Sequence, residues 1–227
     1  MMKRPKSESG QAMLEFAIVS ISLAFLFAGA FTIGAMLNKA LQVSNITRSA
    51  AVLMVSSVTN PSSSLNLAVA QNQRILIREA NGLGMASDTS FDPSSTGSGA
   101  IFLSKIILVG ANECAAGTTG KTPPWTTSNC PNYNSYVFAY YVPIGNKTRW
   151  ASAFGTPQTS DIQADGTVAT TDIATDTGVQ IPTATVTAAI TLAQSQYALI
   201  AETFADISNI AIFSLYKPPV VYYRTIT

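Results

Sequence analysis

One stretch near the start of the chain limits what the protein can fold into. From Phe16 to Leu37 the sequence carries no charged residue, and its only hydroxyl side chains are Ser20, Ser22 and Thr32. The stretch is 22 residues long, and about 20 predominantly apolar residues cross a bilayer as an α-helix. The sequence therefore predicts a membrane-spanning helix at this position.

The basic residues around this stretch predict its orientation. Lys3, Arg4 and Lys6 precede it, whereas Lys39 and Arg48 follow it. Basic residues are retained on the cytoplasmic side of a membrane, so a modest excess before the stretch favours a cytoplasmic N-terminus. We therefore expect a single-pass protein of the inner membrane with an extracytoplasmic remainder.

The same helix is predicted to continue beyond the bilayer. Residues 38–58 place apolar side chains at helical spacing, and the first strong break is Asn60-Pro61-Ser62. A helix from Gln11 to Val58 would be about 72 Å long at a rise of 1.5 Å per residue. We therefore expect a transmembrane and assembly helix over residues 11–60, whose second half packs against the exported domain.

Three interpretations of the apolar stretch compete. It can be a plain signal anchor, a cleaved signal peptide with Ala28-Gly29-Ala30 as its cleavage site, or a pilin-type signal. Glu15 separates them, because a carboxylate costs about 2.5–3.5 kcal/mol at the centre of a bilayer. An anchor or a signal peptide gains nothing from this residue. An assembly helix gains from it where a neighbouring subunit supplies the opposite charge.

The residues around Glu15 resemble the processing site of type IV pilins and pseudopilins. Gly10 is followed by Gln11-Ala12-Met13-Leu14-Glu15-Phe16. In that family a prepilin peptidase cuts after the glycine, and glutamate is the fifth residue of the mature chain, as Glu15 is when counted from Gln11. The pattern Gly-Gln-Ala-x-x-Glu-Phe-Ala before a long apolar run is similar to TadE-like proteins. These are pseudopilins or minor pilins of tight-adherence (Flp-type) pilus systems.

The resemblance covers roughly residues 3–60 and implies several roles. Residues 1–10 would be a leader peptide, cut between Gly10 and Gln11. Glu15 and Phe16 would be assembly residues, with the new amine of Gln11 meeting Glu15 of an adjacent subunit. The implied partners are the inner membrane, prepilin peptidase and other pilin subunits. The implied function is that of a structural subunit in pilus assembly, adhesion or secretion, which reaches the cell surface after assembly.

The remaining residues, 61–227, predict an α+β head domain. A second helix is expected over 65–81, followed by a loop over 83–99 and a long polar stretch over 155–180. The apolar interval 207–216 is ambiguous. Alternation and β-branched or aromatic content predict mostly antiparallel strands over 100–109, 135–144, 183–192, 196–204 and 220–226.

The two cysteines, Cys114 and Cys130, predict a disulfide. They have neither a CxxC spacing nor a third ligand, which argues against zinc. In an exported domain a disulfide is favoured, and this one would stabilise its loop by roughly 3 kcal/mol. The alternative is a pair of buried thiols in a cytosolic domain.

The composition argues against catalysis. The chain has no histidine, which removes the usual general base and any Ser-His or Cys-His pair. It has no glycine-rich phosphate loop, and a net charge of +1 gives no footprint for nucleic acid. We therefore expect a protein that is not an enzyme and uses no cofactor. The rival hypothesis is a signal-anchored, monomeric extracytoplasmic binding protein.

Three further features receive structural interpretations. Four aspartates fall within 161–176, and we interpret them as a solvated loop rather than a calcium site, so no metal is expected. Glu202 lies inside a strand pattern and is expected to face solvent. The aromatic side chains of residues 125–150 are expected to pack in the core and the sheet. They are Trp125, Tyr133, Tyr136, Tyr140, Tyr141 and Trp150.

Overall fold

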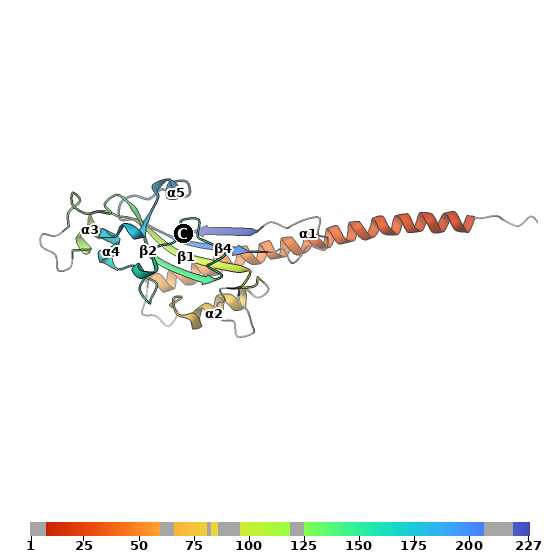
Figure 1. Cartoon of the computed structure of the whole chain (residues 1–227), viewed down its shortest axis with the longest axis horizontal. Helices are drawn as coiled ribbons and strands as arrows, with labels where there is room; N and C mark the ends of the chain where they lie inside the picture. The colour runs from red at the N-terminus through yellow and green to blue at the C-terminus, as the bar shows by residue number, and fades with distance from the viewer. Residues whose placement is uncertain (1–7, 60–65, 81–82, 86–95, 119–124, 207–219) are drawn as a thin grey trace, which may run out of the picture.

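The structure, a computed structural model, consists of one long helix and a head (Figure 1). It describes residues 8–59, 66–80, 83–85, 96–118, 125–206 and 220–227. The helices are α1 (Glu8–Thr59), α2 (Ala70–Glu79), α3 (Ala111–Ala116), α4 (Thr170–Thr175) and α5 (Thr183–Thr187), with 3-10 turns η1 (Thr159–Asp161) and η2 (Thr177–Val179). The strands are β1 (Gly99–Leu108), β2 (Tyr136–Gly145), β3 (Gln180–Ile181), β4 (Tyr197–Ala205) and β5 (Val221–Ile226).

The five strands form one sheet in the order β3-β2-β1-β4-β5, and every neighbouring pair is antiparallel. β1 is the central strand. It pairs with β2 from Ala100, opposite Gly145, to Leu108, opposite Tyr136, with one irregularity after Lys105. The long helix, the further helices and the antiparallel sheet confirm the predicted α+β fold.

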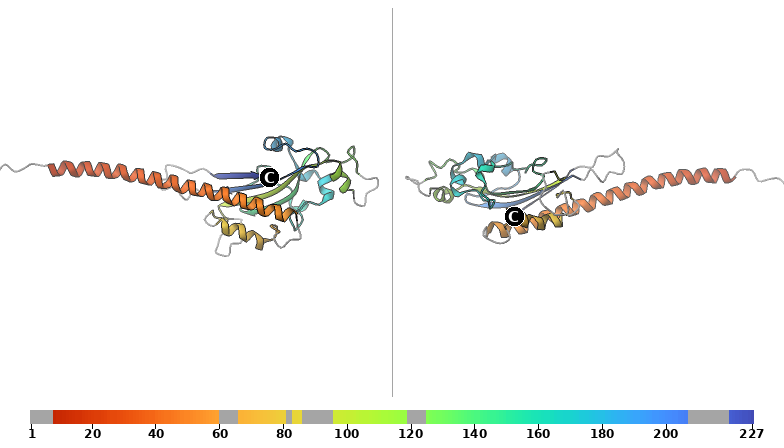
Figure 2. Two further views of the ribbon diagram at one scale, coloured as in Figure 1. Left: turned by 180° about the vertical axis from the view of Figure 1, so that it is seen from behind. Right: turned by 60° about the horizontal axis from the view of Figure 1, so that its bottom comes forward.

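Both faces of this sheet are covered. Side chains of β1 alternate, so that Ile101 and Leu103 face one layer while Phe102 and Ile106 face the other. The first layer is the second half of α1 together with α2. The second layer contains α3, α4 and the disulfide. Figure 2 shows α1 and α2 on one face of the sheet and α3 and α4 on the opposite side.

Helix α1 has two halves with opposite environments. Its first half protrudes from the head and exposes large apolar side chains, such as Phe16 at 73% and Phe31 at 69% (Figure 1). Its second half is buried against the sheet, where Val43 and Met54 are both 0% exposed. The predicted continuation of the helix past the apolar stretch, with its second half packed on the head, is confirmed.

Most predicted elements of the head are found. The strands expected over 100–109, 135–144, 196–204 and 220–226 correspond to β1, β2, β4 and β5, and the expected second helix is present over a shorter range as α2. The polar stretch 155–180 contains η1, α4 and η2, which sequence patterns did not predict. Residues 1–7 of the expected leader and the interval 207–216 lie outside the described residues.

The strand predicted over 183–192 is wrong. Thr183–Thr187 form the short helix α5, and Tyr197 is the first residue of the next strand. The carbonyl of Pro182 accepts hydrogen bonds from Thr185 and Val186, which begins the helical turn. Val186 is the apolar side chain that this turn buries. Burial of one valine in a turn therefore outweighs the strand preference of the Thr- and Val-rich sequence.

The predicted disulfide is present. Cys114 in α3 is bonded to Cys130, with 5.8 Å between the two Cα atoms and 16 residues of sequence separation. Cys114 is 0% exposed and Cys130 is 7% exposed, and both belong to the apolar layer on the face of the sheet opposite α1. The bond therefore ties α3 to the segment that leads into β2.

Removing this bond is expected to destabilise the head without changing its fold. A Cys114→Ser/Cys130→Ser chain should unfold with a free energy lower by about 3 kcal/mol, because its unfolded state is no longer restricted by the cross-link. Urea unfolding in detergent, followed by circular dichroism, measures the difference. A reductant should lower the stability of the natural chain to that of the variant and leave the variant unchanged. Equal stabilities without reductant would contradict the expectation.

Candidate functional site

The protruding half of α1 is the most unusual surface of the protein. Within the described residues, α1 is the one helix that is long and apolar enough to cross a membrane, with a mean hydropathy of 2.3 in its most apolar window. That window is 0% buried within the chain. Exposed apolar patches of soluble monomers rarely exceed a few hundred Å². This half of the helix therefore needs a bilayer or other protein around it.

The residues of the predicted cleavage site lie in the first turns of this helix. α1 begins at Glu8, so the bond between Gly10 and Gln11 is in its first turn. The side-chain amide of Gln11 donates a hydrogen bond of 3.1 Å to Oε1 of Glu15. Phe16 follows and points outward, 73% exposed. The helical spacing thus places residues 11 and 15 on one face of the helix, one turn apart.

Glu15 has no counter-charge in the described part of the chain. Its side chain accepts a hydrogen bond from the neutral amide of Gln11, and no Lys or Arg side chain among the described residues forms an ion pair with it. The next charged residue along the helix is Lys39, about 36 Å away at 1.5 Å per residue. An opposite charge at this depth must therefore come from the chain's own N-terminus or from another molecule.

Polar contacts join the second half of α1 to the head. The hydroxyl of Thr47 lies 2.8 Å from that of Thr203 in β4 and also donates to the carbonyl of Val43 at 2.7 Å. Further along α1, the hydroxyl of Ser57 lies 3.1 Å from that of Tyr140 in β2 and accepts a hydrogen bond from the amide of Leu67. These groups are buried, and each finds a partner, so they specify one docking position for the helix.

Apolar packing surrounds these contacts. Small side chains on the buried face of α1 let its backbone come close to β4, and larger side chains fill the space on either side. The fully or nearly fully buried residues of this face are Val43, Ile46, Thr47, Ala50, Ala51, Met54 and Ser57. Helix and head therefore form one unit, in which a movement of α1 carries the sheet with it.

The expectation that Glu202 faces solvent is wrong. This residue of β4 is 0% exposed. Its carboxylate accepts hydrogen bonds from the hydroxyl of Tyr222 at 2.7 Å, from the amide of Ala153 at 3.3 Å and from the hydroxyl of Ser152. Burial, followed by the hydrogen bond to this carboxylate, raises the pKa of Tyr222. Alternation failed to predict this site because both faces of the sheet are covered, so neither face of β4 is open to water.

Aromatic side chains pack around the same carboxylate. The ring of Phe204 lies 4.7 Å from that of Tyr222 and 5.7 Å from that of Trp150, measured between centroids. Tyr136, Tyr140 and Tyr141 are each at most 5% exposed. The expectation that the aromatic side chains of the central region pack in the core and the sheet is confirmed for these three tyrosines.

The four aspartates of the polar stretch do not form one cluster, and two of them accept local hydrogen bonds. Asp165 accepts hydrogen bonds from the amide and the hydroxyl of Thr167, and Asp176 accepts one from the amide of Gly178. Within the described residues no three Asp, Glu, Cys or His side chains lie close enough to share a metal ion. The carboxylates of Asp165 and Asp176 therefore stabilise local turns.

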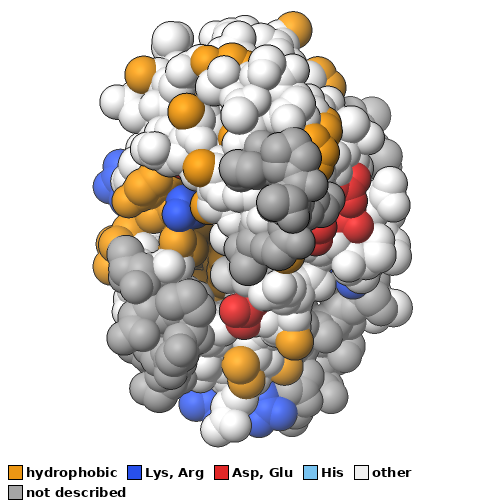
Figure 3. Space-filling model, turned by 90° about the vertical axis from the view of Figure 1, so that its left-hand side faces the viewer, with side chains coloured by type: hydrophobic (Ala, Val, Ile, Leu, Met, Phe, Trp, Pro, Cys, Tyr) orange, Lys and Arg blue, Asp and Glu red, His pale blue; other side chains and the backbone are white. Residues whose placement is uncertain are grey.

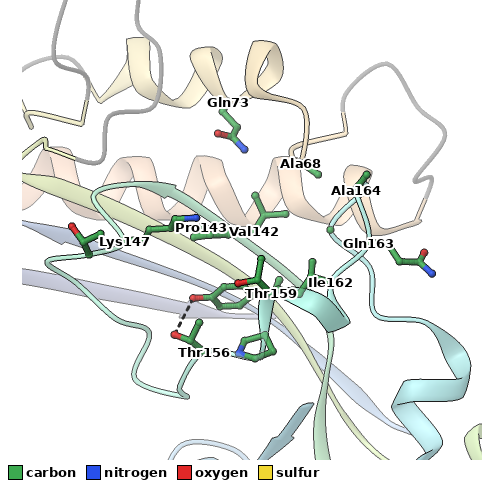
Figure 4. Close-up of a pocket in the computed structure, with 14 residues that line it drawn as sticks. Ala68, Gln73, Val142, Pro143, Lys147, Thr156, Thr159, Ile162, Gln163 and Ala164 are labelled. Carbon is green, nitrogen blue, oxygen red and sulfur yellow. Dashed lines mark hydrogen bonds between the residues drawn. The ribbon is translucent and has the colours of Figure 1, made fainter. Parts of the chain in front are cut away.

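One hollow lies beside the outer edge of β2. It measures about 570 Å³ and is bounded by the approach to α2, by Tyr141–Pro143 and by residues 156–166 (Figure 4). Lys147 is its one charged lining residue among those described, and the hydroxyls of Tyr141 and Thr156 lie 3.4 Å apart at its wall. Its described lining includes no carboxylate, thiol or imidazole, so it brings together no acid–base pair.

The end of the head farthest from the protruding helix carries few charges. Figure 3, which views the molecule from that end, shows many uncharged atoms and scattered hydrophobic side chains, with few Lys, Arg, Asp and Glu side chains. The chain as a whole has only 11% charged residues. This end therefore presents a largely uncharged surface.

Comparisons with family models, with curated proteins and with solved structures found no match to this chain.

The buried tyrosines predict a loss of stability at alkaline pH. Burial raises the pKa of Tyr140 and of Tyr141 above the ordinary value, and hydrogen bonds to Ser57 and Thr156 only partly oppose this. In the unfolded chain tyrosine ionises near pH 10. Above that pH the unfolded state loses its protons first, so the free energy of unfolding decreases as pH rises toward the native pKa values. Below about pH 10 this contribution is fully present.

Urea unfolding at a series of alkaline pH values measures this effect. The Tyr140→Phe chain should lose stability less steeply above pH 10 than the natural chain, although it also loses the hydrogen bond to Ser57. An identical slope for both chains would show that Tyr140 does not contribute to the alkaline sensitivity.

The Glu202 carboxylate predicts different costs for two substitutions. Glu202→Leu removes the acceptor of three donors and should lower the free energy of unfolding by roughly 1–3 kcal/mol, because buried donors lose their partner. Glu202→Gln keeps one oxygen acceptor and should cost less. Tyr222→Phe, which removes one donor, is the matched control. If the leucine variant were as stable as the glutamine variant, the hydrogen bonds would contribute little.

Proposed function

We propose that this protein is a pilin-like structural subunit, a minor pilin or pseudopilin of a type IV-related, tight-adherence pilus system. Before incorporation its N-terminal helix resides in the inner membrane and its head is extracytoplasmic. The observation that carries the proposal is Glu15, an exposed carboxylate in the protruding, predominantly apolar half of α1, at the fifth position after Gly10.

The protruding helix supports assembly by helix packing. Its apolar side chains point outward on all sides, with exposures that include 76% for Met13, 59% for Ile21 and 66% for Phe27. A helix that is apolar all round is stable in a bilayer or inside a bundle of similar helices. The same surface therefore suits both storage in the membrane and burial in a filament, with no change in the helix itself.

Glu15 supports assembly over simple anchoring. Cleavage after Gly10 would create a positively charged amine on Gln11, which is joined to the leader by a peptide bond before cleavage. An amine from an adjacent subunit, placed against Glu15, would supply the counter-charge that the described chain lacks. Removing one partner from a buried ion pair is strongly destabilising. Neighbouring subunits would therefore pack stably only in the register in which the amine and the carboxylate meet.

The rigid connection between helix and head supports a mechanical role. The Thr47–Thr203 and Ser57–Tyr140 contacts and the apolar packing around them join α1 to two strands of the sheet. When α1 is drawn out of the membrane, the head follows as a fixed attachment. The disulfide at the far end of the sheet then holds together the part of the head that would face outward.

Two measurements on the protein from its native cell test the proposal. Its N-terminal sequence and intact mass should show a chain that starts at Gln11. A start at Met1 would favour the membrane-anchored binding protein, for which the hollow beside β2 is a candidate site. A start at Phe31 would indicate a secreted domain, and the pilin proposal would be wrong.

Substitution of Glu15 separates assembly from anchoring. Glu15→Ala should still insert into the membrane, at least as well as the natural chain, because an unpaired carboxylate is removed from the apolar segment. It should no longer be incorporated into sheared surface filaments, measured by immunoblotting. Glu79→Ala, which alters an exposed glutamate that bonds Ser49 at the surface, is the control and should be incorporated. Normal incorporation of the Glu15→Ala chain would refute the assembly role.

A further inference from the structure

The contacts of α1 identify which end of the head lies nearest the membrane. Thr47 contacts Thr203 near the end of β4, whereas Ser57, further along α1, contacts Tyr140 in the middle of β2. Because α1 protrudes at its N-terminal side (Figure 1), the end of β4 is the membrane-proximal end of the sheet. The antiparallel register places the start of β1 and the end of β2 there as well.

The height of this end above the membrane follows from the helix and strand rises. Asp206 is three residues beyond Thr203, which is about 10 Å at roughly 3.3 Å per residue. The same distance is about six to seven residues of α1 at 1.5 Å per residue. Counted back from Thr47, this reaches Ala40 to Leu41, a few residues after the charge-free run that ends at Leu37. The membrane-proximal end of the head therefore lies at the level of the lipid headgroups.

A turn over residues 146–150 is exposed at this end. It follows β2, and Asn146 holds it in place: the side-chain amide donates to the carbonyl of Gly97 at 2.7 Å, and its oxygen accepts from the amide of Arg149 at 3.0 Å. Asn146 is 6% exposed, whereas Lys147 and Arg149 are both exposed. Figure 4 shows Lys147 on the turn that leaves β2. The buried asparagine thus presents two basic side chains outward.

Trp150 completes the turn. Its ring stacks on that of Phe204 with 5.7 Å between centroids and 15° between planes, and the guanidinium of Arg149 lies 5.0 Å from the Trp150 ring centroid. The Arg149 side chain is 47% exposed although it pairs with Asp206, which is only 12% exposed. Lys147 forms no ion pair within the described residues. The exposed charge of the turn is therefore positive.

We propose that the turn 146–150 is a docking surface for anionic phospholipids of the leaflet from which α1 emerges. Lys147 and Arg149 contact lipid phosphates, and Trp150, whose indole nitrogen is buried, packs behind Arg149 and supports the turn. Basic side chains near a bilayer surface are attracted to anionic headgroups. Continuity with the membrane-spanning helix selects this occupant, because α1 holds the turn against the bilayer surface whatever the protein does afterwards.

This contact would set the tilt of the head before assembly. α1 alone fixes the distance of the head from the bilayer but leaves rotation and tilt free. A second contact with the bilayer, made by the turn that follows β2, removes part of that freedom. The inference depends on α1 spanning the bilayer and not on the pilus role.

The chain's two tryptophans, Trp125 and Trp150, provide the test. Full-length Trp125→Phe and Trp150→Phe chains are placed in phospholipid nanodiscs that contain a headgroup-attached spin-label quencher, with and without anionic lipid. Trp125 precedes the disulfide at the opposite end of the sheet, so it is the internal control. We expect the Trp150 signal to be quenched several-fold more than the Trp125 signal, and the difference to increase with anionic lipid.

Charge variants then separate lipid recognition from mere proximity. Lys147→Gln, alone and with Arg149→Gln, should reduce quenching of Trp150 in anionic nanodiscs to its level in zwitterionic ones. Arg74→Gln on α2, which removes a positive charge elsewhere on the head, should leave it unchanged. Lys147→Gln alters no described ion pair, so this variant keeps the test valid if the double variant unfolds. Equal quenching of both tryptophans, or quenching of Trp150 independent of anionic lipid and of Lys147, would overturn the proposal.

Discussion

The docking of α1 onto the sheet is the interaction on which the rest of the structure depends. This one helix of 52 residues lies in two environments. The buried side chains of its second half, from Val43 to Ser57, form part of the layer beneath the sheet. Without these side chains the face of the sheet that contains Ile101 and Leu103 would be open to water. The helix thus supplies both the apolar segment that protrudes from the head and one side of the apolar layer beneath the sheet.

Buried polar groups make this docking specific. Apolar packing alone would allow α1 to slide or rotate over a surface of similar side chains, since hydrophobic burial is not directional. The hydroxyls of Thr47 and Ser57 each meet a partner hydroxyl on the sheet at only one helix position. Glu202 does the same on the other face, where its carboxylate joins β4 to Tyr222 in β5 and to the segment at Ser152. Displacement of any of these elements would leave buried polar groups unpaired.

The chemically distinctive groups lie where the protein meets its surroundings. Glu15 and Gln11 are at the start of the protruding helix, and the basic turn with Trp150 is at the level where the helix leaves its apolar stretch. The intervening 22 residues carry no charge. The proposed assembly contact and the proposed lipid contact are therefore separated by the thickness of a bilayer, and α1 connects them rigidly.

The sequence by itself determined the long helix, the placement of four of the strands, the disulfide pairing and the α+β class, because these depend on local pattern or on there being only two cysteines. It did not determine α5, where burial of Val186 outweighs β propensity, or the burial of Glu202. Nor did it indicate that residues 146–150 and Asp206 share the end of the sheet nearest the protruding half of α1, since the antiparallel register brings together segments far apart in the chain. Local pattern encodes elements, whereas the packing of α1 and the register of the sheet decide which faces are closed and which end lies toward the protruding half of α1.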